Sequence, residues 1–128
     1  IIVMNGDIIT DLNFNSLIEF HQNNKAFATV CCSKYTIKVP YGVITQKNNV
    51  MTSLIEKPSQ DFFINAGIYI FNKDVLALLN SNKMDITDVL NKINRSKKKI
   101  SVFPIHEKWI DIGHHKEFKL AQTEGANN

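Results

Sequence analysis

The sequence predicts an α/β fold, because segments with strand and helix patterns alternate from its first residues. Residues 1–4 form a short apolar run that ends at Asn5-Gly6, as a buried strand does when a tight turn follows. Residues 15–22 carry apolar side chains at near-helical spacing, and residues 26–33 are rich in Val, Thr and Cys, which favour strands. A strand, a helix and a strand with short joints predict a parallel crossover unit. Ligands of such sheets gather at the carboxyl ends of the strands.

The middle of the chain predicts a β-hairpin followed by a buried strand. Residues 41–45 and 50–55 have strand character and flank Asn48-Asn49, a pair that tolerates the positive φ of a hairpin turn. Residues 62–71 are largely apolar, and Gly67 within them indicates a close approach of another backbone segment.

The rest of the chain predicts two short helices, a further strand and a closing helix. Helical spacing covers residues 73–80 and 86–93, and either Asp85 or Thr87 is available to cap the second helix. The remaining predicted elements are a strand at residues 100–105, the segment 109–113, and a closing helix at residues 115–122.

Composition and charge argue against several classes of protein. The 128 residues are 44% hydrophobic with a net charge of +3, so the chain can bury one core and is only mildly basic. The one dense basic run is Lys97-Lys98-Lys99, and every apolar segment is interrupted well before the ~20 residues of a membrane-spanning helix. We therefore expect no nucleic acid and no membrane as partners. Cys31-Cys32 has no partner at zinc-finger spacing, which fits the reducing cytoplasm.

Four places combine polar residues with the end of an apolar strand and are candidates for chemistry. They are Asp7, Glu56-Lys57, the segment from Asn65 to Gly67, and Asp111. Three of them have a structural alternative, because Asp7 can serve a turn, Asp111 can cap a helix, and Glu56-Lys57 can be a solvated strand end. The histidines lack the i, i+4 spacing of a zinc site, and no nucleophile with an adjacent general base is visible.

Five motifs that contain these candidates occur in order along the chain. They are Asn5-Gly6-Asp7, Tyr41-Gly42-Val43, Glu56-Lys57-Pro58, Asn65-Ala66-Gly67-Ile68-Tyr69 and Trp109-Ile110-Asp111-Ile112-Gly113. Together they resemble the sugar-1-phosphate nucleotidyltransferase family, and the resemblance is closest to bacterial members that include the mannose-1-phosphate guanylyltransferase-like group. The resemblance implies a Rossmann-like mixed sheet, incomplete at its N-terminus, and it identifies residues 1–128 as the C-terminal part of a single nucleotidyltransferase domain.

The resemblance also implies a role for each motif. Asp7 and Asp111 hold a magnesium ion, which needs few protein carboxylates when substrate phosphates supply further oxygens. Lys57 meets the phosphate of the sugar and, with the two aspartates, forms the catalytic set. The residues implied to bind the substrate are Tyr41, Gly42, Glu56, Lys57, Asn65 and Gly67.

The implied reaction transfers a nucleoside monophosphate from a nucleoside triphosphate to a hexose-1-phosphate and releases pyrophosphate. The protein would be a magnesium-dependent transferase of nucleotide-sugar biosynthesis, supplying polysaccharide synthesis in a bacterial cytoplasm. The nucleobase, the sugar and the oligomeric state, a homo-oligomer included, stay open.

Two differences separate the sequence from the family pattern. The family's Gly-rich phosphate loop has no counterpart, so we expect the natural chain to begin earlier and this stretch alone to be catalytically incompetent. His114-His115 stands where the family usually has Thr-Pro. The alternative hypothesis is a non-catalytic regulatory subunit or module that binds a nucleotide sugar or a sugar phosphate, and an intact upstream Gly-rich loop would argue against it.

Overall fold

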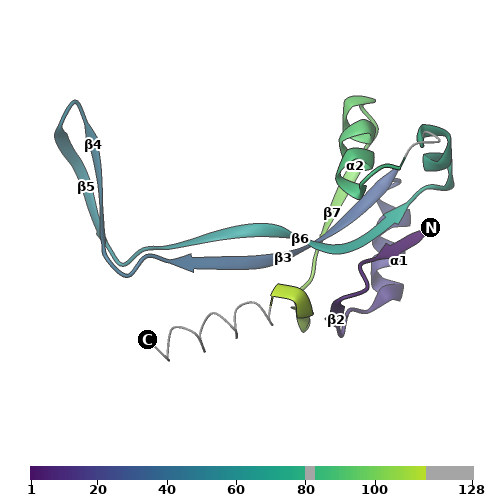
Figure 1. Ribbon diagram of the computed structural model, residues 1–128, viewed down its shortest axis with the longest axis horizontal. Helices are drawn as coiled ribbons and strands as arrows, with labels where there is room; N and C mark the ends of the chain where they lie inside the picture. Colours follow the sequence, from purple (N-terminus) through teal and green to yellow (C-terminus); the bar gives the residue numbers. More distant parts are fainter. Residues whose placement is uncertain (80–82, 115–128) are drawn as a thin grey trace. The chain divides into compact units, whose positions relative to one another are not determined.

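The computed structural model describes residues 1–79 and 83–114, which fall into two compact units. Unit 1 contains residues 1–33 and the chain from Asn65 onwards, and unit 2 contains Lys34–Ile64. The strands β3 (Ala28–Lys38) and β6 (Ser59–Phe71) run from one unit into the other (Figure 1). The chain therefore leaves unit 1 along β3 and returns along β6.

A mixed sheet of four strands lies at the centre of unit 1 among the described residues. Its order is β1-β6-β3-β7, in which β1 is Ile2–Met4 and β7 is Ile100–Pro104. β1 pairs antiparallel with β6, whereas β7 pairs parallel with β3. The predicted Rossmann-like mixed sheet is confirmed. The two strands of the predicted crossover unit, β1 and β3, are not neighbours in this sheet, because β6 lies between them.

Side chains of β6 alternate between two buried clusters that helices cover. Ile68 belongs to the same cluster as Leu17 of the first helix, and Tyr69 belongs to the same cluster as Ile93 of the last one. The helices are α1 (Phe14–Asn23), the 3-10 helix η1 (Lys73–Leu78) and α2 (Ile86–Arg95). Within the described part of the chain, none of them has the length and apolar character needed to cross a lipid bilayer.

A second, two-stranded sheet in unit 1 joins distant parts of the chain. β2 (Ile8–Thr10) pairs antiparallel with β8 (Trp109–Asp111), and its register places Ile8 opposite Asp111. The sequence does not predict β2, because three residues are too few to show a strand pattern.

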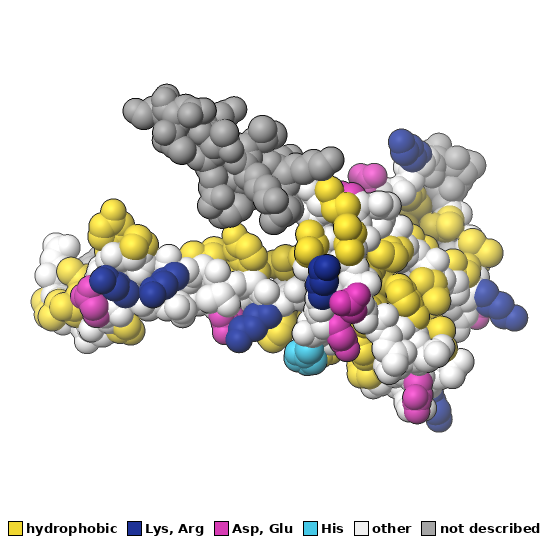
Figure 2. All heavy atoms as spheres, turned by 90° about the horizontal axis from the view of Figure 1, so that it is seen from below, with side chains coloured by type: hydrophobic (Ala, Val, Ile, Leu, Met, Phe, Trp, Pro, Cys, Tyr) yellow, Lys and Arg dark blue, Asp and Glu magenta, His cyan; other side chains and the backbone are white. Residues whose placement is uncertain are grey.

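Unit 2 contains the predicted β-hairpin. β4 (Gly42–Lys47) pairs antiparallel with β5 (Val50–Glu56), and the turn residues Asn48 and Asn49 have φ angles of 51° and 66°. Both angles are positive, as the predicted hairpin turn requires. Figure 2 shows hydrophobic side chains at the surface of this unit. The large ones that are exposed are Tyr35, Ile37, Tyr41, Ile44, Val50, Met51, Leu54, Ile55, Phe62 and Phe63.

Several predicted elements differ in extent from the observed ones. β3 continues past residue 33 to Lys38, and β6 is buried only from Ala66 to Phe71, so the predicted burial of residues 62–71 is wrong for their first part. Phe63, for example, is 72% exposed. The helix predicted at residues 73–80 is the 3-10 helix η1, and the helix predicted at residues 115–122 lies outside the described residues.

Candidate functional site

Asp7 and Asp111 lie together in unit 1 because two short strands pair. Asp7 directly precedes β2, and Asp111 is the last residue of β8. The strand register places Ile8 opposite Asp111, and the Ile112 backbone N–H donates to the Asp7 carbonyl over 2.9 Å. These bonds fix the two aspartate-bearing segments side by side.

Gly113 lies close to both carboxylates. A Cβ atom on Gly113 would lie 3.3 Å from Asp7 Oδ2 and 3.3 Å from Asp111 Oδ1. Both carboxylate oxygens therefore lie close to one point, and the distance between them is at most twice 3.3 Å. Because glycine has no Cβ, no side chain occupies this point.

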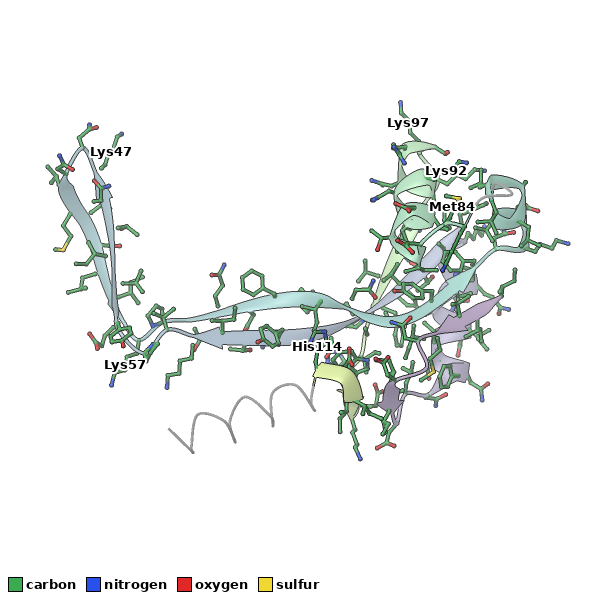
Figure 3. All side chains as sticks on the ribbon, viewed as in Figure 1. Lys47, Lys57, Met84, Lys92, Lys97 and His114 are labelled. Atoms are coloured by element: carbon green, nitrogen blue, oxygen red, sulfur yellow. The ribbon has the colours of Figure 1, made fainter. Side chains whose placement is uncertain are left out.

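The backbone that follows Asp111 also holds its carboxylate. The His114 N–H donates to Asp111 Oδ1 over 3.3 Å, and His114 Nε2 lies 3.9 Å from Asp111 Oδ2. The short helical segment that carries His114 follows β8 (Figure 3). The structural alternative for Asp111, a helix cap, is therefore confirmed. It is compatible with ion binding, because each carboxylate oxygen can accept more than one interaction.

The donor set at Gly113 fits a magnesium ion. Mg²⁺ is usually bound through one or two carboxylates together with water and substrate phosphate oxygens. Asp7 Oδ2 and Asp111 Oδ1 supply that number of protein ligands. In the described ranges, at Gly113 or elsewhere, no group of three or more His, Cys, Asp or Glu side chains could hold a metal ion. The pair thus suits an ion shared with substrate phosphates better than one enclosed by protein ligands alone.

The segment from Asn65 to Gly67 is bound to the residues that precede Asp7. The Asn5 N–H donates to the Gly67 carbonyl over 2.8 Å, and Gly67 has a φ of 75°. A Cβ atom on Gly67 would lie only 2.6 Å from Asn5 Nδ2. The close backbone approach predicted at Gly67 is therefore confirmed.

Trp109 links the same segment to the strand that carries Asp111. Its indole Nε1–H donates to the Ala66 carbonyl over 2.8 Å, and its ring packs against the cluster that contains Ile68. The segments that contain Asp7, Asn65 and Asp111 are thus joined by backbone and indole hydrogen bonds.

The other predicted site residues lie at the open end of the hairpin in unit 2. Gly42 pairs with Glu56, and a Cβ atom on Gly42 would lie 3.2 Å from Glu56 Oε2. The Lys57 N–H donates to the Tyr41 carbonyl over 3.1 Å. Figure 3 shows Lys57 at this end of the hairpin and Lys47 near its tip. All four predicted residues are exposed, so a ligand can reach their polar groups.

The predicted site residues therefore form two groups, each within its own unit. Unit 1 holds Asp7, Asn65, Gly67 and Asp111, and unit 2 holds Tyr41, Gly42, Glu56 and Lys57.

Comparison with known families decides what kind of protein carries these groups. A family model described as nucleotidyl transferase matches residues 1–127. The chain belongs to the nucleotidyl transferase family. This membership confirms the resemblance that the five ordered motifs predict.

Curated relatives of the chain include fungal and insect proteins. Mannose-1-phosphate guanyltransferase of Yarrowia lipolytica is 33% identical over 120 residues, which are 91% of this chain and 33% of the relative. The mannose-1-phosphate guanylyltransferase catalytic subunit beta of Drosophila melanogaster is also 33% identical over 120 residues, 91% of this chain and 32% of that protein. The chain spans about a third of the length of these relatives, and the similarity extends beyond the bacterial members.

Solved structures share the fold of the chain. HddC from Yersinia pseudotuberculosis, complexed with GMP-PN, has a TM-score of 0.58 at 24% identity, over 88% of this chain and 49% of that chain. The UTP-bound UGPase from Acinetobacter baumannii has a TM-score of 0.56 at 17% identity, over 88% of this chain and 45% of that chain. Both likenesses concern the arrangement of strands and helices.

The sequence analysis assigns no role to three residues that support the candidate site. Gly113 leaves space between the carboxylates, Asn5 packs against Gly67, and the Tyr69 hydroxyl contacts Asn65 over 3.0 Å. Each lies inside a motif beside a predicted site residue. Asn65 and Tyr69 are four positions apart, so a strand places both side chains on the same face. This spacing is the feature of the sequence from which their contact could have been predicted.

Proposed function

We propose that the protein carrying this chain is a sugar-1-phosphate nucleotidyltransferase that transfers a guanylyl group from GTP to mannose-1-phosphate. The observation that carries the proposal is the approach of Asp7 Oδ2 and Asp111 Oδ1 to one point at Gly113. Two carboxylates that can share a cation with phosphate groups suit nucleotidyl transfer, which needs no protein nucleophile. The guanylyl and mannose assignments are supported by the names of the fungal and insect relatives.

Each unit carries exposed polar groups to which we assign a part in sugar recognition. The Glu56 carboxylate and the Asn65 amide can form hydrogen bonds with hydroxyl groups, and the exposed Gly42 lets a ligand approach the backbone. Gly67 is buried, its N–H donates to Asn65 Oδ1, and its carbonyl accepts from the Asn5 N–H, so we assign it the support of Asn65 instead of a direct ligand contact. Within unit 2, Tyr41 precedes Gly42 and supplies an aromatic ring that is 74% exposed. The Lys57 ammonium group offsets the charge of the sugar phosphate.

In the proposed reaction, an oxygen of mannose-1-phosphate attacks the α-phosphorus of GTP. A phosphorus–oxygen bond to the sugar phosphate forms as the bond to pyrophosphate breaks. The attacking phosphate is already anionic near neutral pH, so positioning and charge neutralisation supply the rate without a general base. Asp7 and Asp111 would hold magnesium, which when bound supplies positive charge against the phosphoryl oxygens.

The product, a nucleotide sugar, would serve polysaccharide synthesis, and we place the protein in a bacterial cytoplasm, where nucleoside triphosphates are made. The rival hypothesis, a regulatory module that binds a nucleotide sugar or a sugar phosphate, predicts binding without turnover. The two hypotheses therefore differ in pyrophosphate release.

The deciding experiment measures pyrophosphate release by the full-length protein with magnesium, four nucleoside triphosphates and a panel of hexose-1-phosphates. The proposal expects GTP with mannose-1-phosphate to be the preferred pair. Turnover with another pair would correct the substrates and keep the reaction. Binding of mannose-1-phosphate or GDP-mannose without turnover of any pair would favour the regulatory module.

A further inference from the structure

The side-chain oxygen of Asn65 is occupied within unit 1. The Gly67 N–H donates to Asn65 Oδ1 over 2.9 Å, and the Tyr69 hydroxyl donates to the same atom over 3.0 Å. A backbone N–H can only donate, so the atom that faces Gly67 must be the oxygen of the amide and not its nitrogen. The orientation of the Asn65 amide is therefore decided by its neighbours.

The amide nitrogen of Asn65 is consequently the group that a ligand meets. Asn65 is exposed, and its Nδ2 forms no hydrogen bond with any residue in ranges 1–79 and 83–114. This nitrogen carries two N–H donors and has no acceptor capacity. A ligand bound here must present an acceptor oxygen.

Tyr69 is buried in the core, whereas Asn65, which it contacts, is exposed. Its side chain is 1% exposed, lies in the cluster that contains Val89 and Ile93, and stacks on Phe71 with ring centroids 6.0 Å apart. A ring packed in this way keeps its hydroxyl in one place. The hydroxyl is therefore a fixed donor that reaches from the core to an exposed side chain.

We propose that Tyr69 is a positioning residue, which orients Asn65 so that Nδ2 donates a hydrogen bond to an oxygen of the bound sugar-1-phosphate. The inference rests on the proposed function for the identity of the ligand. The acceptor is either a sugar hydroxyl or a phosphate oxygen, since both accept hydrogen bonds from an amide. Asn65 touches the ligand, and Tyr69 acts only through Asn65.

The first test is Tyr69→Phe in the full-length protein, with Tyr35→Phe as the matched control. Tyr35 is 54% exposed, and its hydroxyl forms no side-chain hydrogen bond with the described residues. Tyr69→Phe should raise KM for mannose-1-phosphate about 3- to 10-fold and change KM for GTP less than about 2-fold. Tyr35→Phe should change neither. A purely structural role would reduce the folded fraction and leave both KM values alike, so an unchanged KM for mannose-1-phosphate in Tyr69→Phe overturns the inference.

A second variant tests the direction of the hydrogen bond. Asn65→Asp keeps an acceptor for Gly67 and Tyr69 but cannot donate to a ligand. It should lose mannose-1-phosphate use as strongly as Asn65→Ala does. Near-normal use by Asn65→Asp would show that Asn65 accepts from the substrate, which contradicts the proposal.

Calorimetry separates this inference from the proposed reaction. If the unmodified protein binds mannose-1-phosphate without turnover, Tyr69→Phe should still weaken that binding about 3- to 10-fold, and equal affinities would overturn the positioning role. A protein that neither binds nor converts mannose-1-phosphate overturns both. Inorganic phosphate identifies the acceptor, because Tyr69→Phe should weaken its binding only if Asn65 donates to a phosphate oxygen.

Discussion

Gly113→Ala is the most direct test of the geometry proposed for the metal site. The substitution adds a single methyl group at the point that both carboxylates approach. Alanine is favoured over glycine in helices, and Gly113 lies in a short helical segment, so we expect no loss of stability from the backbone. Any loss of activity then reports on the space between Asp7 and Asp111.

The size of the effect follows from the distances. The new methyl carbon would lie 3.3 Å from Asp7 Oδ2 and 3.3 Å from Asp111 Oδ1, which is closer than ordinary van der Waals contact. The carboxylates must therefore move by a few tenths of an ångström. Magnesium requires near-ideal octahedral geometry, so we expect a loss of about 1.4 to 2.7 kcal/mol of transition-state stabilisation, which is about 10- to 100-fold in kcat/KM.

The assay is pyrophosphate release at increasing magnesium concentrations, accompanied by direct measurement of Mn²⁺ binding. Gly6→Ala is the matched control, because a Cβ atom on Gly6 would have nothing within 4 Å and the φ angle of Gly6 is not positive. Gly113→Ala should need more metal for half-maximal rate, whereas Gly6→Ala should behave as the unmodified protein does. Equal metal dependence in all three proteins would refute the assignment of the ion to the two carboxylates beside Gly113.

Three further predictions follow from the contacts in unit 1. Asp111→Asn should lower kcat by about 100-fold or more with little change in melting temperature, because asparagine caps helices as well as aspartate but is a poor magnesium ligand; near-normal turnover would contradict the metal role. Gly67→Ala should lower the free energy of unfolding by about 1 to 3 kcal/mol in urea titrations, because of its φ of 75° and the contact with Asn5, and an unchanged midpoint would show that this segment adapts. Burial lowers the pKa of His21 below 6.5, and its Nδ1 lies 2.7 Å from the Thr29 hydroxyl. The unfolded state then binds more protons, so stability should fall as the pH drops below 6.5, and His21→Gln should reduce the difference between urea midpoints at about pH 7.5 and about pH 5.5.

Elements with a strong local pattern could be predicted from the sequence. The helical spacing of residues 15–22 predicts helix α1, and in the structure Asn13 caps it, because its side chain accepts from the Ser16 N–H over 3.2 Å. The hairpin turn lies at Asn48 and Asn49, the residues that tolerate the positive φ observed there. In both cases the residues that fix the backbone are neighbours in sequence.

Features that depend on distant partners could not be predicted in the same way. β2 is a strand because it pairs with β8, which lies near the other end of the described chain. The first half of β6 carries apolar residues but remains exposed, and burial begins only at Ala66, where the two clusters of unit 1 cover the strand. Apolar character alone does not tell which strand segments a core will cover.

The sequence by itself determined the family, through its ordered motifs, and the alternation of strands and helices, because these are properties of local pattern and residue type. The site residues that the resemblance implies stay a prediction. Only the tertiary structure decided that Asp7 Oδ2 and Asp111 Oδ1 approach one point at Gly113. It also decided that Asn65 presents its amide nitrogen, because Gly67 and Tyr69 occupy its oxygen. The physical reason is that a hydrogen-bond direction and a distance between carboxylates depend on strand register and core packing, which bring together atoms from distant positions in the chain.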